Sequence, residues 1–164
     1  MPPDLWLFFC PLKKVRTDFI VEKATELGVA RIIPVQTEHT NVDRIKLSRL
    51  SAHAIEAAEQ CGGTYIPKIE ELQKINEVLE HFPPDRRLLF CDEKLKASEL
   101  NLENLKKGKW AILIGPEGGF SEIERNYIKG LKFTFSISLG PRILRADTAA
   151  VTAIALWQNY LGDW

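Results

Sequence analysis

The chain has 164 residues, of which 45% are hydrophobic and 27% are charged, and its 22 basic and 22 acidic residues leave no net charge. This length and composition fit a single globular domain over residues 1–164 with a sizeable core, and they exclude a disordered chain. The balanced charge also excludes the overall positive field of a free-standing nucleic-acid binder. Any affinity for a nucleic acid must therefore come from a local patch, a groove between subunits or a further domain.

The cysteines and the apolar residues near the N-terminus indicate the cellular compartment. Cys10, Cys61 and Cys91 are odd in number and widely separated, so they match neither a disulfide framework nor a zinc site. The apolar residues 5–10 are too short to span a membrane and lack the basic flank of a signal peptide. We expect a cytoplasmic protein with no membrane association, in which residues 5–10 form a buried first strand.

Helices and strands alternate along the first half of the chain. A helix over 17–27 is predicted by its apolar face and by Gly28, which ends it. The next predicted elements are a strand over 29–35, a helix over 43–61 and a helix over 70–80.

The second half continues the alternation. Ser121, followed three residues later by Glu124, has the spacing of a capping box and predicts a helix start. The other predicted elements are strands over 87–91, 110–114 and 133–139 and a helix over 148–161. The pattern predicts an α/β fold with a mostly parallel sheet flanked by helices.

The last helix has almost no polar face between residues 149 and 157. A helix that is apolar all round must be covered all round. The sequence therefore predicts either a partner chain or threading of this helix into the fold.

Two glycine-proline loops each follow an apolar run. Residues 113–121 read Leu-Ile-Gly-Pro-Glu-Gly-Gly-Phe-Ser, and residues 139–145 read Leu-Gly-Pro-Arg-Ile-Leu-Arg. Glycine lets a ligand approach the main chain, and proline stiffens the turn. A pair of such loops at neighbouring strand ends predicts a pocket. The alternatives are tight turns without a ligand, or phosphate binding, although neither loop has a Walker or dinucleotide-binding pattern.

Together with residues 22–29 (Glu-Lys-Ala-Thr-Glu-Leu-Gly-Val) and 56–62 (Glu-Ala-Ala-Glu-Gln-Cys-Gly), these loops resemble the RsmE family of 16S rRNA uracil N3-methyltransferases, in the SPOUT superfamily. The resemblance implies a SPOUT-type sheet with a C-terminal trefoil knot, a homodimer packed through that region, and S-adenosylmethionine-dependent methylation of uracil N3 in the small ribosomal subunit. Members usually also have an N-terminal PUA-like barrel, which would precede residue 1. We expect either a trimmed catalytic domain or a naturally short member.

The same resemblance places the cofactor on the two loops, because an adenine ring needs small or aliphatic neighbours and main-chain groups at its edge. The predicted cofactor-binding residues are Leu113, Ile114, Gly115, Gly118, Leu139, Gly140, Ile143 and Leu144. Ile143 and Leu144 also suit a core role. Glu117, a charged residue among glycines, is a catalytic candidate, or it favours the following helix N-terminus through the helix dipole.

Arg142 and Arg145 are difficult to explain as core residues, because an unpaired buried arginine is costly. Arg145 is the first choice for catalysis, where it would stabilise negative charge on the uracil carbonyls. Arg142 is assigned to phosphate contact or structural pairing, and the reverse assignment remains open. Asp147 either caps the last helix or pairs with Arg145 or with an arginine of a partner.

Substrate-side candidates are basic or polar residues: Lys14, Arg16, Glu59 and Gln60, with a further basic cluster at Arg44, Lys46 and Arg49. Phosphate contacts would position RNA without reading its sequence, and solvated surface is the alternative. The three histidines have no metal-ligand spacing, so no metal is expected. Two rival functions remain: a SPOUT enzyme acting on another RNA site, such as a tRNA ribose 2′-hydroxyl, and a non-catalytic RNA- or ribosome-binding module. Departures from the family pattern at His39 and Gly63 make the module credible.

Overall fold

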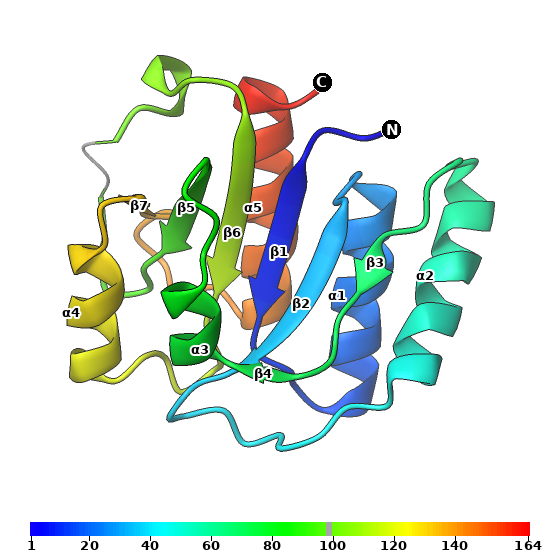
Figure 1. Cartoon of the computed structure of the whole chain (residues 1–164), viewed down its shortest axis with the longest axis horizontal. Coiled ribbons are helices and arrows are strands. Elements are labelled where there is room, and N and C mark those ends of the chain that lie inside the picture. The colour runs from blue at the N-terminus through cyan, green and yellow to red at the C-terminus, as the bar shows by residue number, and fades with distance from the viewer. Residues whose placement is uncertain (98–99) are drawn as a thin grey trace.

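A parallel sheet with helices on both faces forms the protein, seen in a computed structural model that describes residues 1–97 and 100–164 (Figure 1). The sheet order is β3-β2-β1-β6-β5-β7, and the short β4 pairs with the end of β2. The strands are β1 Leu5–Phe9, β2 Arg31–Gln36, β3 Lys68–Ile69, β4 Gln73–Lys74, β5 Arg86–Cys91, β6 Lys109–Ile114 and β7 Thr134–Ile137. The α-helices are α1 Lys14–Glu26, α2 Leu47–Cys61, α3 Ile75–Glu80, α4 Glu122–Gly130 and α5 Ala146–Leu161. The predicted α/β class with a mostly parallel sheet is confirmed.

The strand register brings distant loops to one edge. β1 pairs with β6 from Leu5 opposite Trp110 to Phe9 opposite Ile114, and β5 pairs in parallel with both β6 and β7. Because every paired strand is parallel, the carboxyl ends meet at a single edge of the sheet, where ligands bind in open α/β folds. In Figure 1 the arrowheads point to that edge.

Side chains of successive strand residues enter two different cores. Leu7 and Phe9 pack with α1, α2 and α5 on one face, whereas Phe8 packs with α3 and α4 on the other. Both faces of the sheet are therefore buried, which explains the continuous apolar runs at β1 and β6.

Helix α5 is buried along one side and half-buried along the other. Trp157 is fully buried, and Ala150, Ala153 and Ile154 pack with it against the sheet and α1. Val151, Thr152 and Ala155 lie half-buried along the other side. This second side forms an apolar stripe that the described chain leaves partly exposed.

The helix predicted over 17–27 begins earlier, at Lys14, and two other predicted helices begin later than expected. The helix predicted over 43–61 begins at Leu47, because the preceding residues are extended and Ile45 packs against the core. The helix predicted over 70–80 begins at Ile75, because Gln73 and Lys74 pair with Val35 and Gln36 at the end of β2 instead. In both cases a tertiary contact overrides the local helical pattern.

Both chain ends lie at the amino edge of the sheet (Figure 1). The Asp4 carbonyl accepts a hydrogen bond from the Trp110 N–H at 3.2 Å, and the Gly162 carbonyl accepts one from Lys107 Nζ at 3.3 Å. Among residues 1–97 and 100–164, no helix combines the length and the apolar character needed to cross a bilayer.

Candidate functional site

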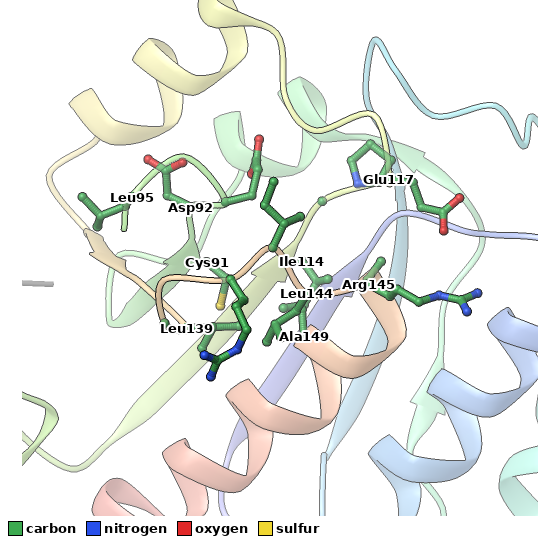
Figure 2. A pocket seen from close by; sticks show the side chains of 16 residues that line it. Cys91, Asp92, Leu95, Ile114, Glu117, Leu139, Leu144, Arg145 and Ala149 are labelled. Atoms are coloured by element: carbon green, nitrogen blue, oxygen red, sulfur yellow. The ribbon is translucent and has the colours of Figure 1, made fainter. Parts of the chain in front are cut away.

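A pocket of about 250 Å³ lies where the loops after β5, β6 and β7 meet. Its walls come from residues 91–95, 114–117 and 139–146, together with Ala149 of α5. Figure 2 shows Asp92 and Leu95 across the pocket from Leu144 and Ala149, with Ile114 between them. The predicted pocket therefore exists, and its walls include both glycine-proline loops.

Most of the predicted cofactor-binding residues line this pocket: Ile114, Gly115, Leu139, Gly140, Ile143 and Leu144. Leu113 does not, since it is fully buried and its side chain enters the core on the α3 and α4 face. Gly118 lies against His39 instead, where an added Cβ would come within 3.2 Å of the histidine Cβ. Ile143 is 87% exposed, so it is available at the pocket mouth rather than packed in the core.

The glycines in the two loops serve different needs. An added Cβ at Gly115 would lie 2.5 Å from the Phe120 ring, so only glycine lets the first loop pack on this buried aromatic side chain. Gly140 has a φ of 111°, a backbone conformation that disfavours side chains, and no atom within 4 Å of an added Cβ. The main chain at Gly140 is therefore open to an approaching ligand.

The wall after β5 is anchored by a buried arginine. Arg125 of α4 forms ion pairs with Asp92 and with Glu93, the latter at 2.7 Å, and its side chain is 5% exposed. Burial lowers the pKa of Arg125. Our sequence analysis missed this wall, although these carboxylates directly follow the predicted strand 87–91 and the strand-end argument applies to them equally.

Charged side chains meet at the pocket mouth. The Arg16 guanidinium bonds to Glu117 and to Asp147, with Nη2 2.9 Å from Asp147 Oδ1. The hydrogen bond from Arg16 lowers the pKa of Asp147. Arg145 Nε lies 3.9 Å from the same Asp147 oxygen, and its side chain is 68% exposed. Figure 2 shows Arg145 and Glu117, the predicted catalytic residues, on the same side of the pocket.

The predicted substrate-side residues are not all brought together. Arg142 lines the pocket, whereas Arg16 is held by two carboxylates. Lys14 lines a neighbouring hollow. Glu59 and Gln60 are exposed near the end of α2, which runs against the strands and ends at the opposite edge of the sheet (Figure 1).

Two observations concern the cysteine, histidine and acidic residues of the described chain. Burial raises the pKa of the Cys91 thiol to about 12, so the pocket cysteine stays protonated at neutral pH and is a poor nucleophile. Within the part of the chain that the structure describes, no group of three or more histidine, cysteine or acidic residues is arranged to hold a metal ion.

Comparison with known proteins identifies the family of this chain. A family model described as an RNA methyltransferase domain matches residues 1–158. The ribosomal RNA small subunit methyltransferase E of Rickettsia conorii is 35% identical over 147 residues, covering 88% of this chain and 59% of the relative. The chain thus spans about three fifths of the length of that curated relative.

Two solved structures are also similar over nearly the whole chain. One is the methyltransferase E of Neisseria gonorrhoeae bound to S-adenosyl methionine, with a TM-score of 0.85, 31% identity and coverage of 99% of this chain and 68% of the other. The second is a methyltransferase of Legionella pneumophila in complex with the same cofactor, with a TM-score of 0.86, 31% identity and coverage of 99% and 69%. This chain belongs to the RNA methyltransferase domain family that includes the ribosomal RNA small subunit methyltransferases E.

Proposed function

We propose that this protein transfers a methyl group from S-adenosylmethionine to N3 of a uridine in the 16S rRNA of the small ribosomal subunit, in the cytoplasm. One observation carries the proposal: the loops after β5, β6 and β7 converge on a pocket with an aliphatic lining and an open main chain. The crystal structure of the N. gonorrhoeae relative, similar over 99% of this chain, contains bound S-adenosylmethionine.

The pocket residues fit such a cofactor. Ile114, Leu139 and Leu144 offer aliphatic surface for an adenine ring, and the open backbone at Gly140 can reach its edge. The cofactor would supply an electrophilic methyl group. The loops would hold and orient it, which accounts for much of the rate gain in a transfer between two bound partners.

Arg145 is assigned the catalytic role. Uracil N3 is a poor nucleophile until it loses its proton to solvent, and the resulting negative charge spreads onto the flanking carbonyl oxygens. Attack on the methyl group would then release S-adenosylhomocysteine. Arg145 is exposed at the mouth, and among residues 1–97 and 100–164 its ion-pair partner is Asp147 at 3.9 Å, so its N–H groups are available to those oxygens. Glu117 and Asp147 hold Arg16 between the first loop and α5, which supports the position of Arg145.

Calorimetry with S-adenosylmethionine, followed by methyl transfer to small subunits lacking the modification, tests the function. We expect cofactor binding and the formation of 3-methyluridine in the rRNA. Methylation of a ribose hydroxyl would assign the protein to another RNA site, and cofactor binding without any transfer would favour a non-catalytic module.

We infer in addition that the C-terminal segment forms a trefoil knot and that the protein is a homodimer. After β7 the chain passes the pocket loops and continues as α5 on the other side of the sheet, against α1. The half-exposed stripe of Val151, Thr152 and Ala155 offers a surface for a second copy. Pulling single molecules from both ends tests the knot, because a knotted chain unfolds to less than its full contour length.

A further inference from the structure

A second hollow lies beside the pocket, at the same edge of the sheet. It has a volume of about 730 Å³ and is formed by residues 11–18, after β1, and residues 42–50, after β2. Leu12 and Leu50 are buried in its floor, and Ile45 is half-buried beside them. We call it the basic hollow because of the side chains around its rim.

The rim joins two basic clusters that are distant in the sequence. Its cationic side chains, all exposed, are Lys13, Lys14, Arg44, Lys46 and Arg49. The carboxylates of the hollow are Asp18, which is buried and bound to Arg49 at 2.5 Å, and Asp43, which lies 3.9 Å from Arg44. No ion pair engages Lys13, Lys14 or Lys46 within residues 1–97 and 100–164. In a chain without net charge, this hollow is therefore a local concentration of positive charge.

The basic hollow and the pocket share a border. The Cys10 N–H donates to the Ile114 carbonyl at 3.3 Å, so the turn after β1 lies beside the first pocket loop. Lys14 faces the hollow, and Arg16, two residues later, binds Glu117 at the pocket mouth. An extended polymer bound in the hollow can therefore continue directly to the pocket.

We propose that the basic hollow binds the sugar-phosphate backbone of single-stranded RNA on one flank of the nucleotide to be methylated. The proposal rests on the proposed function, because it places the substrate of that reaction. The cationic rim suits phosphates, and the aliphatic floor can take the face of a base. The described lining contains no aromatic side chain for stacking, so binding should be dominated by charge and carry little sequence preference.

Fluorescence anisotropy with a short labelled single-stranded RNA, titrated over a series of salt concentrations, tests the proposal. In the double variant Lys14→Ala/Lys46→Ala we expect roughly tenfold weaker binding at low salt. The slope of log affinity plotted against log salt concentration should also be less steep by about 1.4. The matched control is Lys129→Ala/Lys132→Ala, which removes the same charge from exposed positions in the last turn of α4 and just after it and should bind like the unchanged protein. Equal affinity and equal salt dependence in the first double variant would overturn the proposal.

Two further measurements separate this proposal from the proposed function. The double variant should keep the S-adenosylmethionine affinity of the unchanged protein, since neither lysine lines the pocket. RNA binding that depends on both lysines, in a protein that transfers no methyl group, would support the basic hollow as an RNA-binding site and refute the proposed function. Methyl transfer that is unchanged by the loss of both lysines would refute the basic hollow as an RNA-binding site and support the proposed function.

Competition by poly-glutamate as strong as that by RNA would assign the hollow to an acidic protein partner and overturn the RNA proposal.

Discussion

Arg16 and Asp147, separated by 131 positions in the sequence, form an ion pair that joins the first turn of α1 to the first turn of α5. The same guanidinium bonds to Glu117 on the loop after β6. One arginine thus ties together two walls of the pocket mouth, next to Arg145. We therefore interpret Arg16 as a residue that positions the site, and not as a free phosphate ligand.

This pair should make stability depend on pH in the acid range. Arg16 holds the pKa of Asp147 below its usual value, so the pair's contribution is fully present above the ordinary aspartate pKa. It is lost as the pH falls through the lowered folded-state pKa. Arg16→Met should reduce the free energy of unfolding by about 1 kcal/mol at neutral pH and by less near pH 2. Urea unfolding at both pH values measures this, and a difference independent of pH would contradict it.

Arg145→Ala should affect turnover and not cofactor affinity, because its charge is used in the transition state. We expect methyl transfer to slow by roughly a hundredfold, as for the loss of one oxyanion donor. Arg145→Lys keeps the charge without the planar fork and should rescue only partly. Single-turnover methylation beside a cofactor titration provides the test. Near-normal turnover would refute the assignment, and loss of cofactor binding or dimerisation would make Arg145 structural.

Gly140→Val should abolish detectable S-adenosylmethionine binding. A valine at a φ of 111° is strained by about 1–3 kcal/mol, and its side chain would enter the open space through which a ligand reaches the main chain. Gly130→Val at the end of α4 is the control, since it also meets no neighbour and has no positive φ. Calorimetry on both folded variants tests this. Unchanged affinity in Gly140→Val would remove the second loop from the site.

Arg125→Met should destabilise the protein by about 3 kcal/mol, because it leaves Asp92, 2% exposed, without its charged partner. Cofactor affinity should fall as well, since Arg125 also anchors Glu93 in the pocket wall. Adding Asp92→Asn removes the unpaired charge and should recover part of the stability. A urea-unfolding cycle of the single and double variants measures the coupling. Purely additive effects would show that the pair does not act as a unit.

The apolar stripe of α5 makes the dimer testable. Val151→Lys places a charge on the half-buried stripe and should yield a monomer in sedimentation velocity at micromolar concentrations, where we expect the unchanged protein to be a dimer. Asn159→Lys, at an exposed position near the end of the same helix, is the matched control and should remain dimeric. A monomeric unchanged protein would refute the homodimer.

Local patterns in the sequence predicted most of the fold. The capping box formed by Ser121 and Glu124 is confirmed, because its hydrogen bonds span only three residues. Consecutive apolar residues predicted β1 and β6, because a strand buried on both faces needs them. The pairing of Gln73 and Lys74 with β2 depends on the free edge of a strand far away in the sequence, so no local pattern reveals it.

In the candidate site, too, local sequence patterns predicted some features, and contacts between distant residues could not be predicted. Glycines, prolines and strand ends predicted the two loops, and parallel pairing explains why they meet. The Arg16–Asp147 and Arg125–Asp92 pairs join residues from different parts of the chain and become visible only in the folded structure. The distance of Glu59 and Gln60 from the pocket likewise follows from the direction of α2 against the sheet.

The position of the two chain ends has a practical consequence. They leave the sheet at its amino edge, so a tag, fluorophore or surface tether at residue 1 or 164 lies at the edge opposite the pocket and the basic hollow (Figure 1). Protein attached to a surface by either end should present both binding regions to the solution. Cofactor and RNA binding can then be measured on the same immobilised molecules, before and after a change of salt.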